Sequence, residues 1–121
     1  MTPAKVELGR KLFYDQALSG NSTYSCASCH RQELAFTDGR ARALGSTGEI
    51  HPRSAMSLAN VAYSATLTWA DPVLTRLEDQ MLTPMFNQQP VELGLAGLEA
   101  ALLERIASSP GYPAMFAAAF P

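Results

Sequence analysis

Apolar residues recur at helical spacing close to the N-terminus of the chain. Thr2 precedes Pro3, and a hydroxyl cap followed by proline is a common helix start, so the pattern predicts a helix from Pro3. The apolar positions of this helix fall on and beside one face: Val6, Leu8, Gly9, Leu12 and Phe13. A glycine in mid-helix costs about 1 kcal/mol against alanine, which indicates that a second helix crosses closely at Gly9. The alternative is a glycine that the helix merely tolerates.

The second half of the chain predicts four more helices. Residues 54–64 form a short one, and a second begins at Asp71, which caps it, and ends near residue 83. Residues 95–108 have the strongest helical pattern, and a last helix begins within 110–121, where the end of the chain cuts it short. The second and third of these helices are expected to bury the following residues: Val73, Leu74, Leu77 and Met81, and Leu95, Leu98, Leu102, Leu103 and Ile106.

The region between these helices, residues 14–53, is dense in turn formers and has almost no periodicity. So long a loop region is unusual in a domain with an ordinary core, so we expect the loops to fold around a non-protein centre. No segment alternates as a strand does. The expected fold class is all-α, with residues 1–121 as one domain.

The composition narrows the possible partners. A net charge of −2 gives no electrostatic reason to expect nucleic acid or an anionic membrane. Hydrophobic residues make up 47% of the chain and charged residues 17%, which suits a globular domain that wraps an apolar group. No apolar run approaches the ~20 residues of a membrane span. The N-terminus also lacks the apolar region of a signal peptide, so a leader is not part of this sequence.

The only two cysteines stand in the pentapeptide Cys26-Ala27-Ser28-Cys29-His30. This C-x-x-C-H pattern is the attachment signature of c-type haem. Two thiols one helical turn apart can each add to a haem vinyl group, and the adjacent histidine is then the proximal ligand of the iron. Because this attachment normally takes place outside the bacterial cytoplasm, we expect a periplasmic protein.

Three other interpretations of this pentapeptide are weaker. A structural zinc site needs four ligands, and only His51 remains as a further good donor. A thioredoxin-like dithiol normally lies in a βαβ context, which the pattern lacks. Two buried structural cysteines would not explain the polar residues beside them. We therefore favour haem.

The second face of such a haem decides between two classes of protein. A sixth ligand from the protein makes an electron carrier, whereas an open face makes an enzyme or a sensor. The chain offers five methionines as candidate ligands: Met1, Met56, Met81, Met85 and Met115. Of these, Met81 and Met85 are the best placed, although packing is the commoner role of methionine. A monohaem electron carrier with Met81 or Met85 as sixth ligand is the alternative function.

Several separate motifs, from residue 7 to residue 120, match a known family. The stretches "ELGRKLFYD", "TYSCASCH" and "AFTDGR" are followed by "HPRSAMSLANVAYSATLTWADPVLTRLEDQMLTPMF" and "PVELGL". Together they resemble the N-terminal haem domain of the bacterial dihaem cytochrome c peroxidases and MauG-type enzymes. The residues of these motifs are most similar to those of the MauG-like subgroup that includes the methanobactin-associated dihaem enzyme. The resemblance implies a class I cytochrome c-like helical domain around one covalently bound haem.

The resemblance also implies roles for individual residues. Cys26 and Cys29 would hold the haem, and His30 would ligate its iron. Trp69 matches a tryptophan that relays electrons between two haems. Three more residues match the pocket in which hydrogen peroxide binds: Gln80, Pro84 and Glu92. The glutamate would act as acid–base catalyst in splitting the O–O bond.

The chain departs from the family pattern in three respects. Ser46 stands where typical dihaem peroxidases have a histidine that blocks the iron, so the pocket should be open without reductive activation. Ser54 replaces the asparagine that binds calcium between the haems, so calcium at an interhaem site is less firmly implied. Relatives also carry a second haem domain, which these 121 residues lack. We interpret the chain as the N-terminal domain of a longer dihaem enzyme, incomplete for turnover alone.

The resemblance implies an oxidoreductase that uses hydrogen peroxide to oxidise a protein partner by long-range electron transfer. Without the resemblance, Trp69 would be interpreted as core or pocket wall, Glu92 as an exposed loop acid and Gln80 as an exposed helix residue. His51 precedes a proline in a polar loop, so we expect it to face solvent, with weak iron ligation as the alternative. The electron donor or protein substrate cannot be named from the sequence.

Overall fold

The computed structural model describes residues 1–69 and 72–121. It contains six α-helices and three short 3-10 helices in those ranges: α1 Pro3–Tyr14, η1 Gln16–Leu18, α2 Cys26–Cys29, η2 Gln32–Leu34, η3 Val61–Tyr63, α3 Leu77–Gln80, α4 Leu82–Phe86, α5 Glu99–Ser108 and α6 Tyr112–Ala119. Three isolated bridges pair short loop segments, and the described residues contain no strand. The predicted all-α class is confirmed.

The N-terminal helix begins where its cap predicts. The Thr2 hydroxyl accepts a hydrogen bond from the Lys5 amide at 3.3 Å, and Pro3 is the first helical residue. The buried position of α1 is Leu8, which packs against Tyr112 and Ala119 of α6. A methyl group added at Gly9 would meet no atom within 4 Å. The prediction of a helix crossing at Gly9 is therefore wrong, because α6 packs on the Leu8 side of α1.

The C-terminal helices form the second part of the core. Leu102 of α5 joins a buried cluster with Leu18, Leu93 and Leu95. The helix begins at Glu99, four residues later than predicted, because Leu95 turns inward and its amide donates to the Met85 carbonyl at 3.0 Å. Leu98 and Leu103, which the sequence predicts to be buried with this helix, are exposed. The predicted final helix is confirmed as α6.

The middle of the chain is less helical than its pattern predicts. Only η3 lies within 54–64, since Asn60 has a left-handed backbone (φ 56°) that interrupts any longer helix. Asp71, the predicted cap of the next helix, lies outside the described residues. That helix begins only at Leu77, and Val73 and Met81, expected to be buried, expose 80% and 50% of their surface. The helical spacing of Val73 and Met81 therefore does not identify a buried face of the helix.

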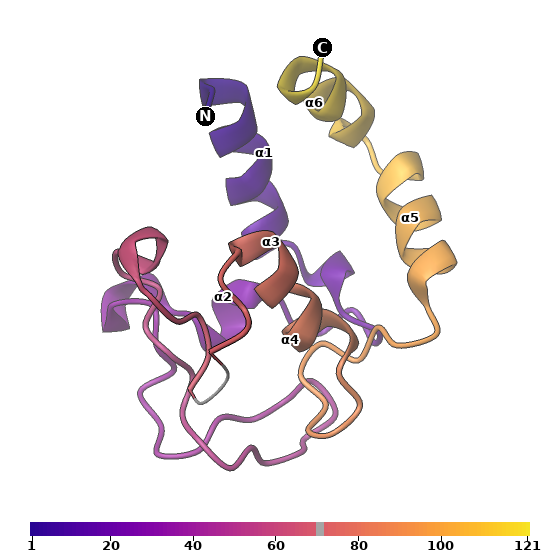
Figure 1. Ribbon diagram of the computed structural model, residues 1–121. Coiled ribbons are helices and arrows are strands. Elements are labelled where there is room, and N and C mark those ends of the chain that lie inside the picture. Colours follow the sequence, from indigo (N-terminus) through magenta and orange to yellow (C-terminus); the bar gives the residue numbers. More distant parts are fainter. Residues whose placement is uncertain (70–71) are drawn as a thin grey trace.

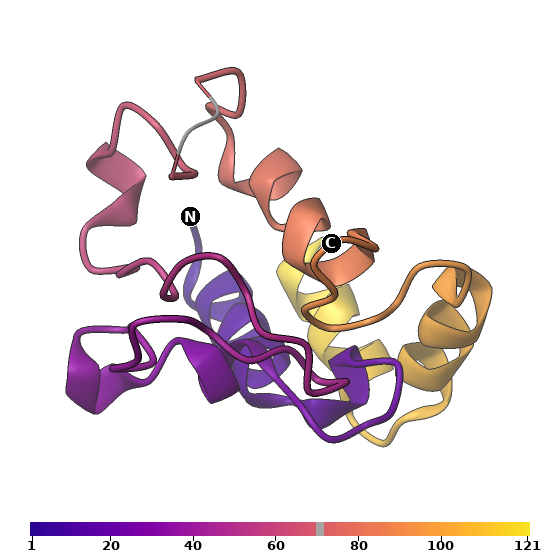
Figure 2. The same ribbon diagram turned by 90° about the horizontal axis from the view of Figure 1, so that it is seen from below.

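The molecule has a helical end and a loop-built half. Helices α1 and α6 lie side by side, with both termini at that end, at the top of Figure 1. Below them the chain runs in long loops around α2, as Figure 2 shows from the other direction. A compact monomer of this mass exposes about 6,300 Å². This chain exposes 7730 Å², so it is less compact than a typical monomer, and its exposed residues include large apolar side chains such as Tyr63 and Val73.

Candidate functional site

The Cys26–His30 motif is held in a single turn of helix. Ser25 and Ser28 form a reciprocal capping box, in which the Ser25 amide donates to the Ser28 hydroxyl at 3.0 Å. Cys26 and Cys29 are both half-buried on this turn and are not joined to each other. The two cysteines therefore begin and end the same turn of helix.

The orientation of the His30 ring is fixed by one hydrogen bond. Its Nδ1 lies 2.9 Å from the Phe36 carbonyl oxygen, which can only accept, so Nδ1 carries the proton. The carbonyl is aimed at the ring because Ala35 and Phe36 both adopt left-handed backbone conformations, at φ 53° and 61°. In the neutral ring, Nε2 then keeps its lone pair. A histidine whose second nitrogen is held in this way is the usual arrangement of a metal ligand.

The thiols are neutral rather than activated. Burial, together with the nearby charges of Asp38 and Glu92, raises the pKa of the Cys29 thiol to about 11. Burial also raises the pKa of Cys26. Redox-active dithiols have a lowered pKa, so these groups do not resemble a thioredoxin-type site. Nor do three or more His, Cys, Asp or Glu side chains of the described residues gather as a zinc site requires.

A small hollow of about 50 Å³ lies beside Cys29. Its walls are formed by these residues: Tyr24, Ser28, Cys29, Arg31, Asp38, Arg40 and Leu44. The Asp38 carboxylate is buried there, and its Oδ2 has no hydrogen-bond partner among the described residues. Arg31 and Arg40 bring guanidinium groups, which suit the carboxylates of an organic cofactor.

Glu92 lies within electrostatic reach of the motif. Burial raises the pKa of its carboxyl group, while the charges of His51 and His30 lower it. In turn the Glu92 charge raises the pKa of both thiols. Glu92 is therefore not an exposed loop acid but a half-buried group whose charge acts on the Cys26–His30 motif.

Two other predicted pocket residues lie on the α3–α4 pair. Pro84 lies in α4, and its carbonyl accepts a hydrogen bond from the Leu93 amide at 2.9 Å. Pro84 and the segment around Glu92 are thus brought together. Gln80 is the last residue of α3 and is half-buried, one helical turn before Pro84 along the chain.

Trp69 lies on the surface rather than in the core. It exposes 52% of its surface, and its indole Nε1 donates to the Ser54 carbonyl at 3.0 Å. The guanidinium of Arg53 lies over the indole ring, 5.7 Å from its centroid. The ring is thus fixed in place but open on one side. Ser54 contributes its backbone to this arrangement.

His51 is buried, and the prediction that it faces solvent is wrong. It exposes 8% of its surface, and its ring Nε2 lies 3.2 Å from the Val91 carbonyl oxygen. The sequence did not indicate this contact, because the two residues are 40 positions apart. Of the candidate methionines, Met85 packs against the core cluster of Leu18, and Met81 is exposed.

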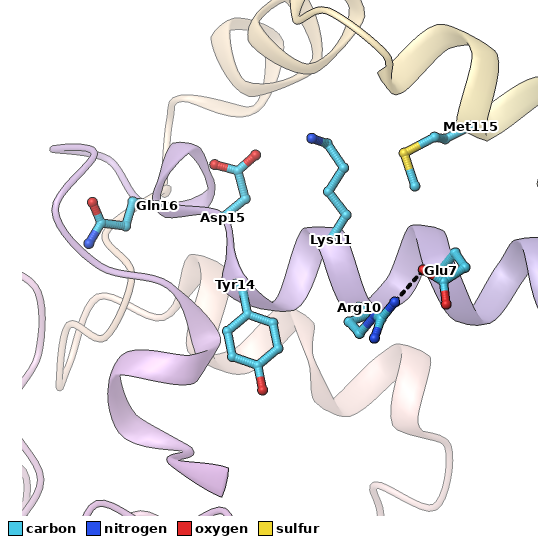
Figure 3. A pocket seen from close by; sticks show the side chains of 7 residues that line it. All are labelled: Glu7, Arg10, Lys11, Tyr14, Asp15, Gln16 and Met115. Carbon is cyan, nitrogen blue, oxygen red and sulfur yellow. Dashed lines mark hydrogen bonds and ion pairs between the residues drawn. The ribbon is translucent and has the colours of Figure 1, made fainter.

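A much wider hollow, of about 850 Å³, lies away from the motif. Figure 3 shows the side chains that line it, from α1, the two residues that follow α1, and α6: Glu7, Arg10, Lys11, Tyr14, Asp15, Gln16 and Met115. Here Arg10 and Glu7 form an ion pair at 2.6 Å, and the Lys11 ammonium lies over the ring of Tyr112. The Tyr112 hydroxyl donates to Asp15 at 2.6 Å. The contacts of Tyr112 with Lys11 and Asp15 join α6 to α1 and to the residue that follows it, and none of these contacts involves a predicted site residue.

These observations define a helical domain with a cytochrome c-type attachment motif. Comparison with known proteins gives the family. The family model described as di-haem cytochrome c peroxidase matches residues 3–121. The chain belongs to this family of peroxidase-like haem oxidoreductases.

Individual relatives agree with this assignment. The chain is 33% identical to the methylamine utilization protein MauG of Methylorubrum extorquens, over 99% of this chain and 33% of that protein. It is 39% identical to the cytochrome-c peroxidase IdrP1 of Denitromonas iodatirespirans, over 96% of this chain and 30% of that protein. The chain thus spans about a third of the length of these relatives.

A solved structure is similar over the whole chain. It is described as a MauG-like protein associated with microbial copper homeostasis, with 51% identity and a TM-score of 0.95. The match covers 100% of this chain and 35% of that one. The predicted membership of the MauG-like dihaem peroxidase family is therefore confirmed. Across the described ranges, no helix is long and apolar enough to cross a membrane.

Proposed function

We propose that this chain is a haem c-binding domain of a periplasmic, peroxide-using MauG-like enzyme. The observation that carries the proposal is the hydrogen bond from His30 Nδ1 to the Phe36 carbonyl at 2.9 Å, which leaves Nε2 available for iron. Cys26 and Cys29 would form the two thioether bonds. When bound, haem supplies an iron that reacts with hydrogen peroxide and exchanges electrons.

The residues present fit this cofactor. The two sulfurs lie on one turn directly before the oriented imidazole. The exposed surface exceeds that of a compact chain of this mass by about 1,400 Å². The arginines that line the hollow beside Cys29 suit the carboxylates of haem.

Glu92 is the group that would move the proton. Its carboxylate would take the proton from the inner oxygen of hydrogen peroxide in the pocket and return it to the outer one. Burial raises the pKa of this carboxyl group toward neutral pH. A carboxyl group with such a pKa exchanges a proton near neutral pH more easily than an exposed carboxylate does. Gln80 and Pro84 would line the same pocket from α3 and α4.

Electrons would enter through Trp69. Its indole is exposed and fixed by the Ser54 carbonyl, which suits contact with a second redox centre. The relatives are about three times as long as this chain, which is long enough for a second haem domain. We propose that such a domain is one partner of this chain. The other partner is a protein electron donor or a protein substrate. Calcium at an interhaem site stays a prediction.

Spectroscopy of the haem-loaded protein tests this proposal. We expect a covalent haem adduct by mass spectrometry, and a high-spin ferric absorption spectrum that shifts when cyanide is added. A low-spin spectrum typical of methionine ligation would support the electron carrier instead, with Met81→Leu and Met85→Leu to identify the ligand. A protein without a covalent adduct after cytochrome c maturation would contradict both.

A further inference from the structure

The backbone on both sides of Glu92 is clamped by one loop, residues 43–51. The Val91 amide donates to the Glu49 carboxylate at 3.1 Å, and the Ser46 amide donates to the Glu92 carbonyl at 2.8 Å. The His51 ring lies 3.2 Å from the Val91 carbonyl. The 43–51 loop therefore binds three backbone groups of Val91 and Glu92, next to the Glu92 side chain.

The close approach of the two segments depends on a missing side chain. A methyl group at Gly45 would overlap the Val91 carbonyl oxygen. The opposite side of the segment is fixed as well, since the Leu93 carbonyl accepts from the Gly20 amide at 2.8 Å. The backbone that carries Glu92 is thus held from two directions, which fixes the point from which its side chain extends.

His51 is the buried side chain in this clamp. Glu49 is exposed, so water competes for its hydrogen bond, and Ser46 uses its backbone amide, which any residue other than proline provides. His51 is itself anchored on both sides: its amide donates to the Ala43 carbonyl, and its carbonyl accepts from Arg42 Nε, both at 2.9 Å. Since its ring faces a carbonyl, Nε2 must carry the proton.

We propose that His51 is a positioning residue for Glu92, which holds the acid–base carboxylate toward the Cys26–His30 motif by donating from Nε2 to the Val91 carbonyl. The inference rests on the proposed function of Glu92. In this role His51 is not a ligand of the iron, which is the alternative suggested by the sequence. The charge of His51 also lowers the pKa of Glu92, which shows that the two groups lie close together.

The test uses two substitutions of similar size in the haem-loaded protein. His51→Gln keeps a side-chain N–H that can reach the Val91 carbonyl, whereas His51→Leu removes the donor. The readout is the association rate of hydrogen cyanide with ferric haem, because the acid must give up its proton to a pocket base. We expect His51→Leu to slow association about tenfold and His51→Gln to restore it to within about twofold. Amide exchange of the 88–94 peptide should quicken in His51→Leu alone.

A double variant separates the positioning role from other effects. If His51 acts through Glu92, His51→Leu combined with Glu92→Gln associates with cyanide no more slowly than Glu92→Gln alone. Additive losses, or equal losses in His51→Leu and His51→Gln, would overturn the positioning role. Normal cyanide association in Glu92→Gln would instead overturn the proposed role of Glu92 itself. Thermal unfolding of each variant identifies any that fail to fold. If His51→Leu fails to fold, slowed cyanide association in a folded His51→Gln, which keeps the donor, would overturn the positioning role.

Discussion

At the helical end, formed by α1, α5 and α6, side chains bury one another, whereas in the loop-built half, residues 26–82, backbone hydrogen bonds hold the chain. Tyr112 and Leu95 expose 1% and 0% of their surface at or beside the helical end. In the loop-built half, Asp38 and His51 are among the buried residues, while Tyr63 and Val73 are 90% and 80% exposed. Where a chain packs against itself, its apolar residues recur at helical spacing along the sequence. Where it wraps another group, its apolar residues need not follow any regular spacing.

The largest expected effect comes from removing the attachment sulfurs. Cys26→Ser combined with Cys29→Ser should abolish covalent haem, because no thiol remains to form a thioether. We then expect amide exchange to rise throughout the loop-built half while α1 and α6 stay protected. Mass spectrometry under denaturing conditions and hydrogen exchange measure both effects. Uniform loss of protection would show that the two regions are not independent.

A core substitution at the helical end should cost several kcal/mol. Leu95→Ala removes a side chain with no exposed surface, and such truncations lower the free energy of unfolding by about 2–5 kcal/mol. The matched control is Leu103→Ala on α5, where 70% of the side chain is exposed, with an expected change within about 0.5 kcal/mol. Denaturant unfolding measures the difference. Equal losses would contradict the assignment of the core.

The hydrogen bond between α6 and the end of α1 should have a smaller effect. Tyr112→Phe keeps the ring but leaves the Asp15 carboxylate without its hydroxyl donor, at a cost of about 1.5–3 kcal/mol. Burial and Asp15 both raise the pKa of Tyr112, so the bond should persist over the whole neutral range. Tyr63→Phe, at an exposed position, should leave thermal stability unchanged.

The smallest effect concerns the pH dependence of stability. Burial raises the pKa of Glu92, so the folded protein favours its protonated form. The stabilising contribution of that form is complete below the pKa of the unfolded chain and is lost as pH rises through the raised pKa. Glu92→Gln should therefore match the wild type at pH 4 and melt a few degrees higher at pH 7. Exposed Glu104→Gln is the control, and a constant difference across this range would contradict the prediction.

The sequence could predict what depends on neighbouring residues. Thr2 with Pro3 is sufficient to define the start of α1, and the Cys26–His30 spacing defines the attachment turn without any tertiary information. The later start of α5 could not be predicted, because it depends on a hydrogen bond from Leu95 to Met85 in a different helix. The same reason applies to His51, whose partner Val91 lies 40 residues away.

In two segments, helical spacing of apolar residues predicts a helix that the structure does not contain. Residues 54–64 and the segment before Leu77 have apolar residues at helical spacing, but Tyr63 and Val73 are not buried by the chain. Periodicity alone does not reveal what an apolar side chain packs against. The quoted motifs were a better guide here, since they singled out Glu92, which is half-buried in the structure although its loop position alone suggests an exposed acid.

The neutral state of the two thiols also has a consequence for biogenesis. In the folded chain, burial leaves Cys29 with a pKa of about 11, so very little thiolate is present at neutral pH to react with a vinyl group. In the extended polypeptide the same sulfurs are solvated and far more reactive. Maturation should therefore load the porphyrin onto the exported chain while it is still unfolded, with folding as the step that follows.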